Sequence, residues 1–193
     1  MLIKRVAVYG LEESIIASGL PKSTEEDGAE YSMERAHILA GCKPGTGHDC
    51  FLKGIIVQAN LTAPSYWWPQ FQRYHFADII SSQSKMHCLN KFDVESMCNG
   101  HVDYRILEIL RTYIDSYNKN KTIDNFVNMV SNVPMGMNLT ARVTLNYLQL
   151  KTIYIQRRGH KLPDWEDFCS WIRSLPEADK LIIVGKTANA VNA

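Results

Sequence analysis

The sequence lacks the features that most directly place a chain in a membrane or outside the cell. Its 193 residues contain no run of eighteen or more apolar residues, so no membrane-spanning helix is expected. The five cysteines are odd in number and form no CxxC pair, which indicates free thiols in a reducing compartment. The opening MLIKRVAVYG, followed at once by LEES, is too short for a secretory signal peptide. We therefore expect a cytoplasmic protein without a membrane partner.

An excess of charge of one sign is also missing. The chain has 21 basic and 20 acidic residues and a formal net charge of +1. Bulk electrostatics therefore gives no argument for binding polymeric nucleic acid, and any anion site must come from local clustering. Histidine and cysteine show no metal-ligand spacing, so we predict no metal site. The alternative is a zinc site drawn from His48, Cys50, His87 or His101.

Length and composition indicate an ordinary globular protein. Hydrophobic residues make up 46% of the chain and charged residues 21%, and there are no repeats or low-complexity segments. A chain of this length can bury one sizeable core, so we expect a single domain over residues 1–193.

The spacing of apolar residues predicts both strands and helices. Polar, glycine-rich stretches at 23–28 and 43–47 predict a turn and a loop. Strands are expected over 6–9 (preceded by Leu2 and Ile3), 55–61 and 138–146, with LIIV at 181–184 as a terminal strand or frayed end. Helices are expected over 33–39, from 65 to about 80, and over 103–117, 123–130, 148–157 and 164–175.

The stretch QFQRYHFADIISSQSKMH, residues 70–87, gathers an unusual number of polar side chains between apolar ones. An anion site requires cations and hydrogen-bond donors in one concave place, and Arg73, Lys85 and the serines between them can supply both. Twelve residues separate the two cations, so they can meet only if the chain turns between them. The alternative is that Arg73 pairs with Asp78 on a partly buried helix.

Two segments resemble the flavin-dependent thymidylate synthases. The first is GHDCFLKGIIVQANLTAPSYWWPQFQRYH, residues 47–75, which follows the family's order of Gly-His, strand, Ala-Pro break and Gln-aromatic-x-Arg-His-Arg helix. The second is PMGMNLTARVTLNYLQLKTIYIQRR, residues 134–158, which resembles the family's Trp-Thr-x-Asn strand and the helix after it. Together the two segments cover a little over a quarter of the chain.

The resemblance implies a thymidylate-synthase-complementing type of α+β fold, with an antiparallel or mixed sheet and long helices. It further implies a homotetramer that binds FAD and a pyrimidine deoxynucleotide, dUMP or a related one, between its subunits. Methylenetetrahydrofolate and NADPH are the other cosubstrates it implies, and the reaction is one-carbon transfer and reduction at C5 of the pyrimidine. The alternative is a non-catalytic oligomeric or nucleotide-binding protein that retains the fold without flavin chemistry.

The family pattern and the local polar cluster together give two groups of candidate ligand-binding residues and no catalytic residue. The substrate group is Gln70, Arg73, Ser81, Ser82, Gln83, Ser84, Lys85 and Arg142. The cofactor group is His48, Arg73, Tyr74, His75, Asn146 and Arg157.

This sequence departs from the signature at several of these positions. Tyr74 stands for histidine and His75 for arginine, while Asp78, Ile80, Gln83 and Lys85 replace a serine, an asparagine, a serine and an arginine. Arg142 lies near the family's substrate arginine, where Thr140 falls. These changes leave fewer of the family's phosphate-binding residues in place, which favours an altered nucleotide or a lost reaction.

Several of these side chains also have purely structural alternatives. Arg157 and Arg158 fit the charged end of a helix, where the helix dipole favours cations. His75 and His48 could hydrogen-bond neighbouring backbone rather than a ligand. Trp67 and Trp68 fit the core or a subunit contact as well as stacking on a ring.

Overall fold

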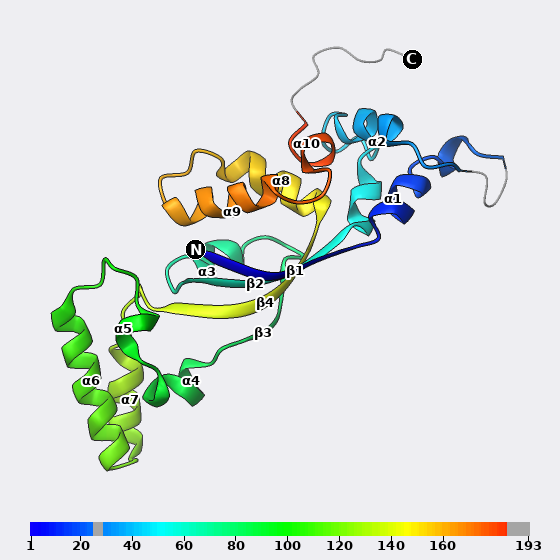
Figure 1. Ribbon diagram of the computed structural model, residues 1–193. Helices are drawn as coiled ribbons and strands as arrows, with labels where there is room; N and C mark the ends of the chain where they lie inside the picture. Colours follow the sequence, from blue (N-terminus) through cyan, green and yellow to red (C-terminus); the bar gives the residue numbers. More distant parts are fainter. Residues whose placement is uncertain (25–28, 185–193) are drawn as a thin grey trace. The chain divides into compact units, whose positions relative to one another are not determined.

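The computed structural model describes residues 1–24 and 29–184, which form a mixed α+β protein (Figure 1). The strands are β1 (Leu2–Tyr9), β2 (Ile56–Pro64), β3 (Asp78–Ser82) and β4 (Asn138–Asn146). The helices are α1 (Leu11–Ala17), α2 (Met33–Ala40), α3 (Trp68–Phe71), α4 (Lys85–Cys88), α5 (Val94–Met97), α6 (Tyr104–Lys119), α7 (Ile123–Ser131), α8 (Tyr147–Arg157), α9 (Pro163–Arg173) and α10 (Ala178–Leu181). Short 3-10 turns occupy Leu20–Lys22 (η1), Cys50–Gly54 (η2) and Leu89–Lys91 (η3).

The strands form one antiparallel sheet in the order β1-β2-β4-β3. The chain divides into two compact units, and every strand contributes residues to both of them. Unit 1 consists of Met1–Lys4, Asn60–Arg73 and Ile79–Val143. Unit 2 consists of Arg5–Ala59, Tyr74–Asp78 and the chain from Thr144 onward. The expectation of a single domain stays a prediction.

In unit 1, the two central strands have one apolar and one polar face. Leu61, Ala63, Ala141 and Val143 are buried on one side, since alternate residues of a strand point to opposite faces. The residues between them are polar and partly exposed, and they are Asn60, Thr62, Thr140 and Arg142. The hydroxyls of Thr62 and Thr140 lie 2.7 Å apart and fix the antiparallel register of β2 against β4.

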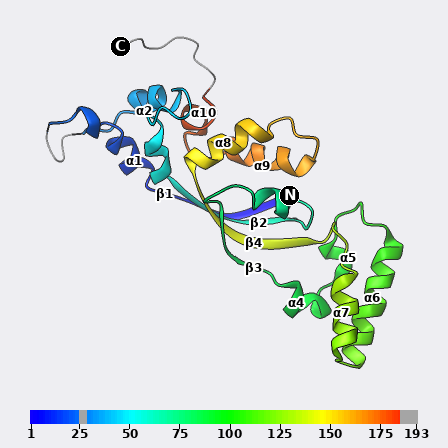
Figure 2. The same ribbon diagram turned by 180° about the vertical axis from the view of Figure 1, so that it is seen from behind.

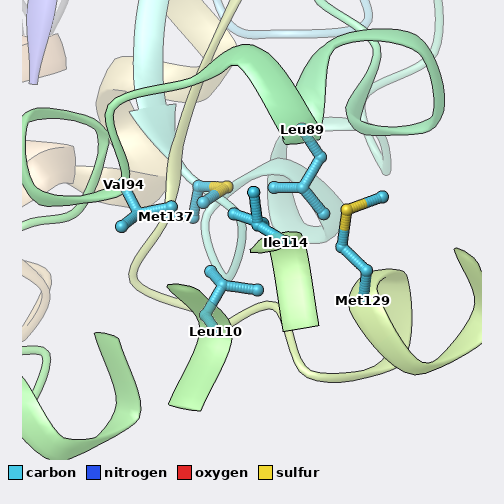
Figure 3. Packing of buried hydrophobic residues seen from close by; sticks show 6 residues of the cluster. All are labelled: Leu89, Val94, Leu110, Ile114, Met129 and Met137. Carbon is cyan, nitrogen blue, oxygen red and sulfur yellow. The ribbon is translucent and has the colours of Figure 1, made fainter. Parts of the chain in front are cut away.

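The helices of unit 1 share a hydrophobic cluster (Figure 3). It consists of Leu89, Val94, Leu110, Ile114, Met129 and Met137. Helices α6 and α7 run side by side in both views (Figures 1 and 2). Asp103 accepts a hydrogen bond from the Arg105 N–H and caps α6, which confirms the predicted start of this helix.

The core of unit 2 lies between α8 and α9, which are neighbours in both views (Figures 1 and 2). Tyr147, Leu150 and Ile153 of α8 are fully buried, as are Trp165 and Phe168 of α9. The bonds of Asn146 and Gln149 at the start of α8 form a capping box, in which each side chain accepts the other residue's backbone N–H. Helix α10 packs against α2.

Gly10 allows a close backbone approach in unit 2. It has a positive φ of 69°, and a Cβ placed on it would lie 2.6 Å from the carbonyl oxygen of Gly54. Only glycine meets both conditions without strain, so α1 and η2 can pack together.

Most of the predicted elements are confirmed, but two are wrong. The helix expected from Ser65 to about residue 80 ends at Phe71, and the chain then turns into strand β3. Ser65 does not cap a helix, because its hydroxyl donates to the carbonyl of Met137 instead. The strand expected at 181–184 is also wrong, since the short helix α10 ends at Leu181. The turn predicted at 23–28 and the tail after 184 lie partly or wholly outside the described residues.

Over residues 1–24 and 29–184, no helix is long and apolar enough to cross a membrane. Within the same ranges, no group of three or more His, Cys, Asp or Glu side chains could hold a metal ion.

The guanidinium of Arg35 holds the end of α1. It donates to the Ser18 hydroxyl at 3.1 Å and to the carbonyl oxygens of Ile15 at 3.1 Å and Glu30 at 2.7 Å. Arg35→Ala leaves these acceptors without their charged donor, so we expect the free energy of unfolding to fall by about 2 kcal/mol. Urea denaturation measures the loss, and Arg35→Lys should retain part of it. A change below about 0.5 kcal/mol in the alanine variant would contradict this assignment.

Candidate functional site

The predicted substrate residues all lie in unit 1. Gln70 is on α3 and Arg73 follows this helix, while Arg142 lies on β4. The remaining five run along the chain from the end of β3 into α4, and they are Ser81, Ser82, Gln83, Ser84 and Lys85. The chain turns after α3 and enters strand β3 at Asp78, so a turn lies between Arg73 and Lys85 in the sequence.

Gln83 acts as an extension of strand β3. Its backbone N–H donates to the Thr140 carbonyl at 2.9 Å, and its side-chain oxygen accepts the Thr140 N–H at 2.9 Å. This glutamine is the residue that replaces the family's signature serine. Its amide oxygen is used in pairing with β4. Of the serines beside it, Ser81 and Ser82 are exposed and Ser84 is half-buried.

Lys85 and Arg142 are both tied to neighbours on the second strand or the segment after it. The Lys85 ammonium lies 3.5 Å from the Ser65 hydroxyl, and Arg142 donates through Nη1 to the Asn60 side-chain oxygen at 3.2 Å. Both side chains are partly exposed. A lysine and an arginine at these positions can attract an anion.

Arg73 has no such neighbour within its own unit. Its side chain is exposed and makes no hydrogen bond or ion pair to the described residues of unit 1. The three aromatic side chains of Trp67, Trp68 and Phe71 on the preceding turn are buried and pack against one another. The core alternative for the two tryptophans is therefore confirmed, and they present no stacking surface to solvent.

Except for Arg73, the predicted cofactor residues all lie in unit 2. Arg157 at the end of α8 donates through Nε to the Tyr74 hydroxyl at 2.6 Å. Its guanidinium also lies over the Trp165 ring at 4.4 Å and over the Tyr74 ring at 5.4 Å. These contacts hold Tyr74 against Arg157 of α8 and Trp165 of α9, and they engage the Nε–H and the plane of the Arg157 guanidinium.

His160 responds to the charge of this cluster. Desolvation and the nearby cations Arg157 and Lys161 lower the pKa of His160 below its usual value. Its Nδ1 accepts the N–H of Leu162 at 3.0 Å, which requires an unprotonated nitrogen. Geometry and electrostatics therefore agree that this imidazole is neutral near pH 7.

His75 is exposed, and its carbonyl oxygen accepts a hydrogen bond from Gln149 Nε2 at 2.9 Å. Asn146 caps α8 through its side-chain oxygen, which accepts the Gln149 N–H at 2.9 Å. Both predicted cofactor residues thus meet at Gln149, a residue that the sequence did not single out.

A cavity of about 330 Å³ opens in unit 2 between the loop before η2 and one side of α8. It is lined by Pro44, Gly45, Gly47, Asp49, Cys50, Lys53, Leu148, Lys151, Thr152 and Ile155. The four α8 residues are spaced three and four apart, so they share one face of the helix. Arg157 points to another side of α8, and the structure does not bring it to this cavity. His48 lies on the lining loop and is exposed.

A buried ion pair belongs to this cavity. The Lys151 ammonium donates to Asp49 Oδ2 at 2.7 Å and to the carbonyl oxygen of Ala40 at 2.6 Å. Both charged side chains are less than a tenth exposed. The signal that could have found them is a lysine inside the apolar run LQLKTIYI, since a buried lysine requires a partner.

No protein-family model matches the chain, and no curated protein matches it in sequence. Solved structures match it nearly end to end. A flavin-dependent thymidylate synthase ThyX from Helicobacter pylori, complexed with FAD and dUMP, has 13% identity and a TM-score of 0.69 over 94% of this chain and 98% of its own. A second structure of ThyX from this organism with FAD and dUMP gives 14%, a TM-score of 0.71, and coverage of 94% and 97%.

A third solved structure belongs to a different enzyme. The UMP/dUMP methylase PolB from Streptomyces cacaoi, bound with 5-Br dUMP, has 10% identity and a TM-score of 0.65 over 97% of both chains. The chain therefore has the fold of the flavin-dependent thymidylate synthases and their relatives, and the resemblance found in its sequence is confirmed at the level of the fold.

Proposed function

We propose that the chain binds FAD and a pyrimidine deoxynucleotide, dUMP or a related one, and catalyses one-carbon transfer and reduction at C5 of the base. The observation that carries this proposal is the fold match over 94–97% of the chain to structures that hold dUMP or its bromo analogue, two of them with FAD. A fold can host several functions, so the residues must also suit these ligands.

The described residues include some of the cations and hydrogen-bond donors that two anionic ligands require. Arg73 is exposed and makes no hydrogen bond or ion pair to the described residues of unit 1, while Lys85 lies beside the Ser65 hydroxyl and Arg142 donates to the Asn60 side-chain oxygen. Ser81 and Ser82 add exposed hydroxyl donors. This set supports binding of a nucleotide phosphate in unit 1. In unit 2, His48 and His75 are exposed and can donate hydrogen bonds to ring or phosphate oxygens of a cofactor.

In this proposal the residues bind and orient the ligands. Arg73 holds a phosphate, Gln70 and the serines orient the nucleotide, and Asn146 and Tyr74 shape the cofactor side through the contacts of α8. The reduced flavin, when bound, supplies hydride. Methylenetetrahydrofolate as the one-carbon donor, NADPH as the reductant, a homotetramer and a cytoplasmic location complete the proposal.

A second candidate function is nucleotide binding without flavin chemistry. The observation that favours it is the use of Arg157 and Gln83 in contacts within the chain, since these contacts reduce the set of groups left for a cofactor and a substrate together.

Thermal denaturation of the purified protein tests both. We expect a yellow protein with flavin absorbance, and a melting temperature raised by several degrees when FAD or dUMP is present at about 100 times its dissociation constant. A purine deoxynucleotide is the control and should give a smaller shift. A colourless protein stabilised by dUMP alone would favour the second function. A protein stabilised by neither ligand would rule out both.

A further inference from the structure

Phe76 has the most unusual combination of backbone and exposure among the described residues of unit 2. Phe76 is 79% exposed, although Ala77 after it is buried and Tyr74, two residues before it, is half-buried. Its φ is +65°, in the left-handed region that residues with a Cβ rarely adopt. An aromatic residue is a poor choice for such a position, where glycine or asparagine would be stable.

The surrounding contacts hold this conformation in place. On its N-terminal side, the Tyr74 hydroxyl accepts the Arg157 Nε–H at 2.6 Å, and the Tyr74 ring packs edge-on against Trp165. Between them, Gln149 Nε2 donates to the His75 carbonyl at 2.9 Å. On the C-terminal side, Ala77 is buried and its N–H donates to the Tyr74 carbonyl at 3.2 Å. The turn is therefore fixed from both ends, and its outermost side chain is a phenyl ring.

Strained and exposed aromatic residues are unfavourable for stability alone. A positive φ costs free energy, and leaving a large apolar ring in water gains nothing from burial. Such outliers concentrate at binding sites, where the surrounding structure enforces them. The contacts of Gln149 and Arg157 provide that enforcement, so these two are positioning residues for the ring.

The imidazole ring of His75, next to Phe76, indicates which kind of ligand fits beside the phenyl ring. The His75 and Phe76 rings lie 6.5 Å apart at an angle of 57°, so they do not stack flat on each other and a face of the phenyl ring stays open. An open aromatic face beside an imidazole that can donate or accept a hydrogen bond suits a planar ring that carries carbonyl groups. Flavin and pyrimidine rings both have this character.

We infer that Phe76 is a stacking residue for the planar heteroaromatic ring of a bound ligand, the flavin or the pyrimidine base. This inference rests on the proposed function and adds a contact that neither the sequence resemblance nor the fold match assigns. The structure presents the ring at the tip of a fixed turn, which places the stacking surface before the ligand arrives.

Ligand titrations of four variants test the inference. Phe76→Gly removes the ring and relieves the positive φ, Phe76→Leu keeps an apolar side chain without a plane, and Phe76→Trp keeps a plane. Ile123→Ala is the control, because Ile123 is 77% exposed on α7. FAD binding is followed by flavin fluorescence and dUMP binding by calorimetry. The melting temperature of each variant is measured without ligand.

We expect Phe76→Gly and Phe76→Leu to raise the dissociation constant of one ligand about tenfold, while Phe76→Trp and Ile123→Ala stay near the wild type. The ligand whose dissociation constant rises is the one whose ring stacks on Phe76. Phe76→Gly should also melt at the same or a higher temperature than the wild type, which separates lost binding from lost folding.

Three results would overturn the inference. If the wild type binds its ligands and Phe76→Gly binds them with the same dissociation constants, the inference is overturned and the proposed function stands. A change only in the molecular mass of the assembly would assign Phe76 to a contact between copies of the chain instead. A wild type that binds neither ligand overturns both the inference and the proposed function.

Discussion

Replacing Lys151 by methionine should lower the free energy of unfolding by about 3–5 kcal/mol. The substitution keeps most of the side-chain volume but removes the ammonium that Asp49 and the Ala40 carbonyl share. Asp49 is 5% exposed and would be left as a buried charge without its partner. Since domains of this size are stable by about 5–15 kcal/mol, the loss is a large fraction of the whole. Urea denaturation followed by circular dichroism measures it.

The matched control is the double variant Lys151→Met with Asp49→Leu. Replacing both members of a buried ion pair by apolar residues is often neutral or stabilising, so the double variant should recover most of the lost stability. A double-mutant cycle with Asp49→Leu alone gives the coupling between the two side chains. If the double variant were as unstable as Lys151→Met, the loss would come from packing, and the ion pair would not explain it.

Arg73→Ala should weaken nucleotide or flavin binding by about 2 kcal/mol or more, which is about thirtyfold in the dissociation constant. Arg73 is exposed and makes no hydrogen bond or ion pair to the described residues of unit 1, so its removal leaves no buried group unsatisfied. The melting temperature of the free protein and the mass of its assembly should therefore stay unchanged. Calorimetric titration with dUMP and with FAD gives the two constants.

Arg158→Ala is the control for charge, because Arg158 is an exposed arginine that follows α8. It should leave both constants within about twofold of the wild type, as expected for a solvated charge at a helix end. Arg73→Lys should fall between wild type and alanine, since an ammonium cannot form the paired contacts of a guanidinium. Equal binding in wild type and Arg73→Ala would mean that the ligand site is misplaced.

The elements with strong local signals were predictable from sequence. Strand β4 has the predicted bounds, and α6 starts at the predicted cap, because alternation and a capping aspartate act locally. The segment after Trp68 was not predictable in this way. Its helical spacing is overridden by pairing with β4, which depends on Thr140, more than fifty residues further along. Strand pairing over such distances leaves no local pattern.

The candidate site residues were chosen from their types and spacing in the sequence, but the contacts that they make within the chain could not be predicted in this way. The sequence singled out Arg73, and the structure leaves its side chain exposed. It also singled out Arg157 and Gln83, and both make contacts within the chain that no spacing rule contains. Phe76 was missed because a positive φ is a property of the backbone, and phenylalanine carries no sequence signal for it. The substrate and cofactor residues named from the sequence stay predictions.

Two sides of helix α8 make different contacts, and this limits how its length can vary. Leu148, Lys151, Thr152 and Ile155 line the cavity, while Gln149 and Arg157 hold the turn that carries Phe76. One inserted or deleted residue rotates everything beyond it by about 100°. Homologous chains should therefore accept many exchanges of side chain in α8 but no change in the number of residues between Gln149 and Arg157.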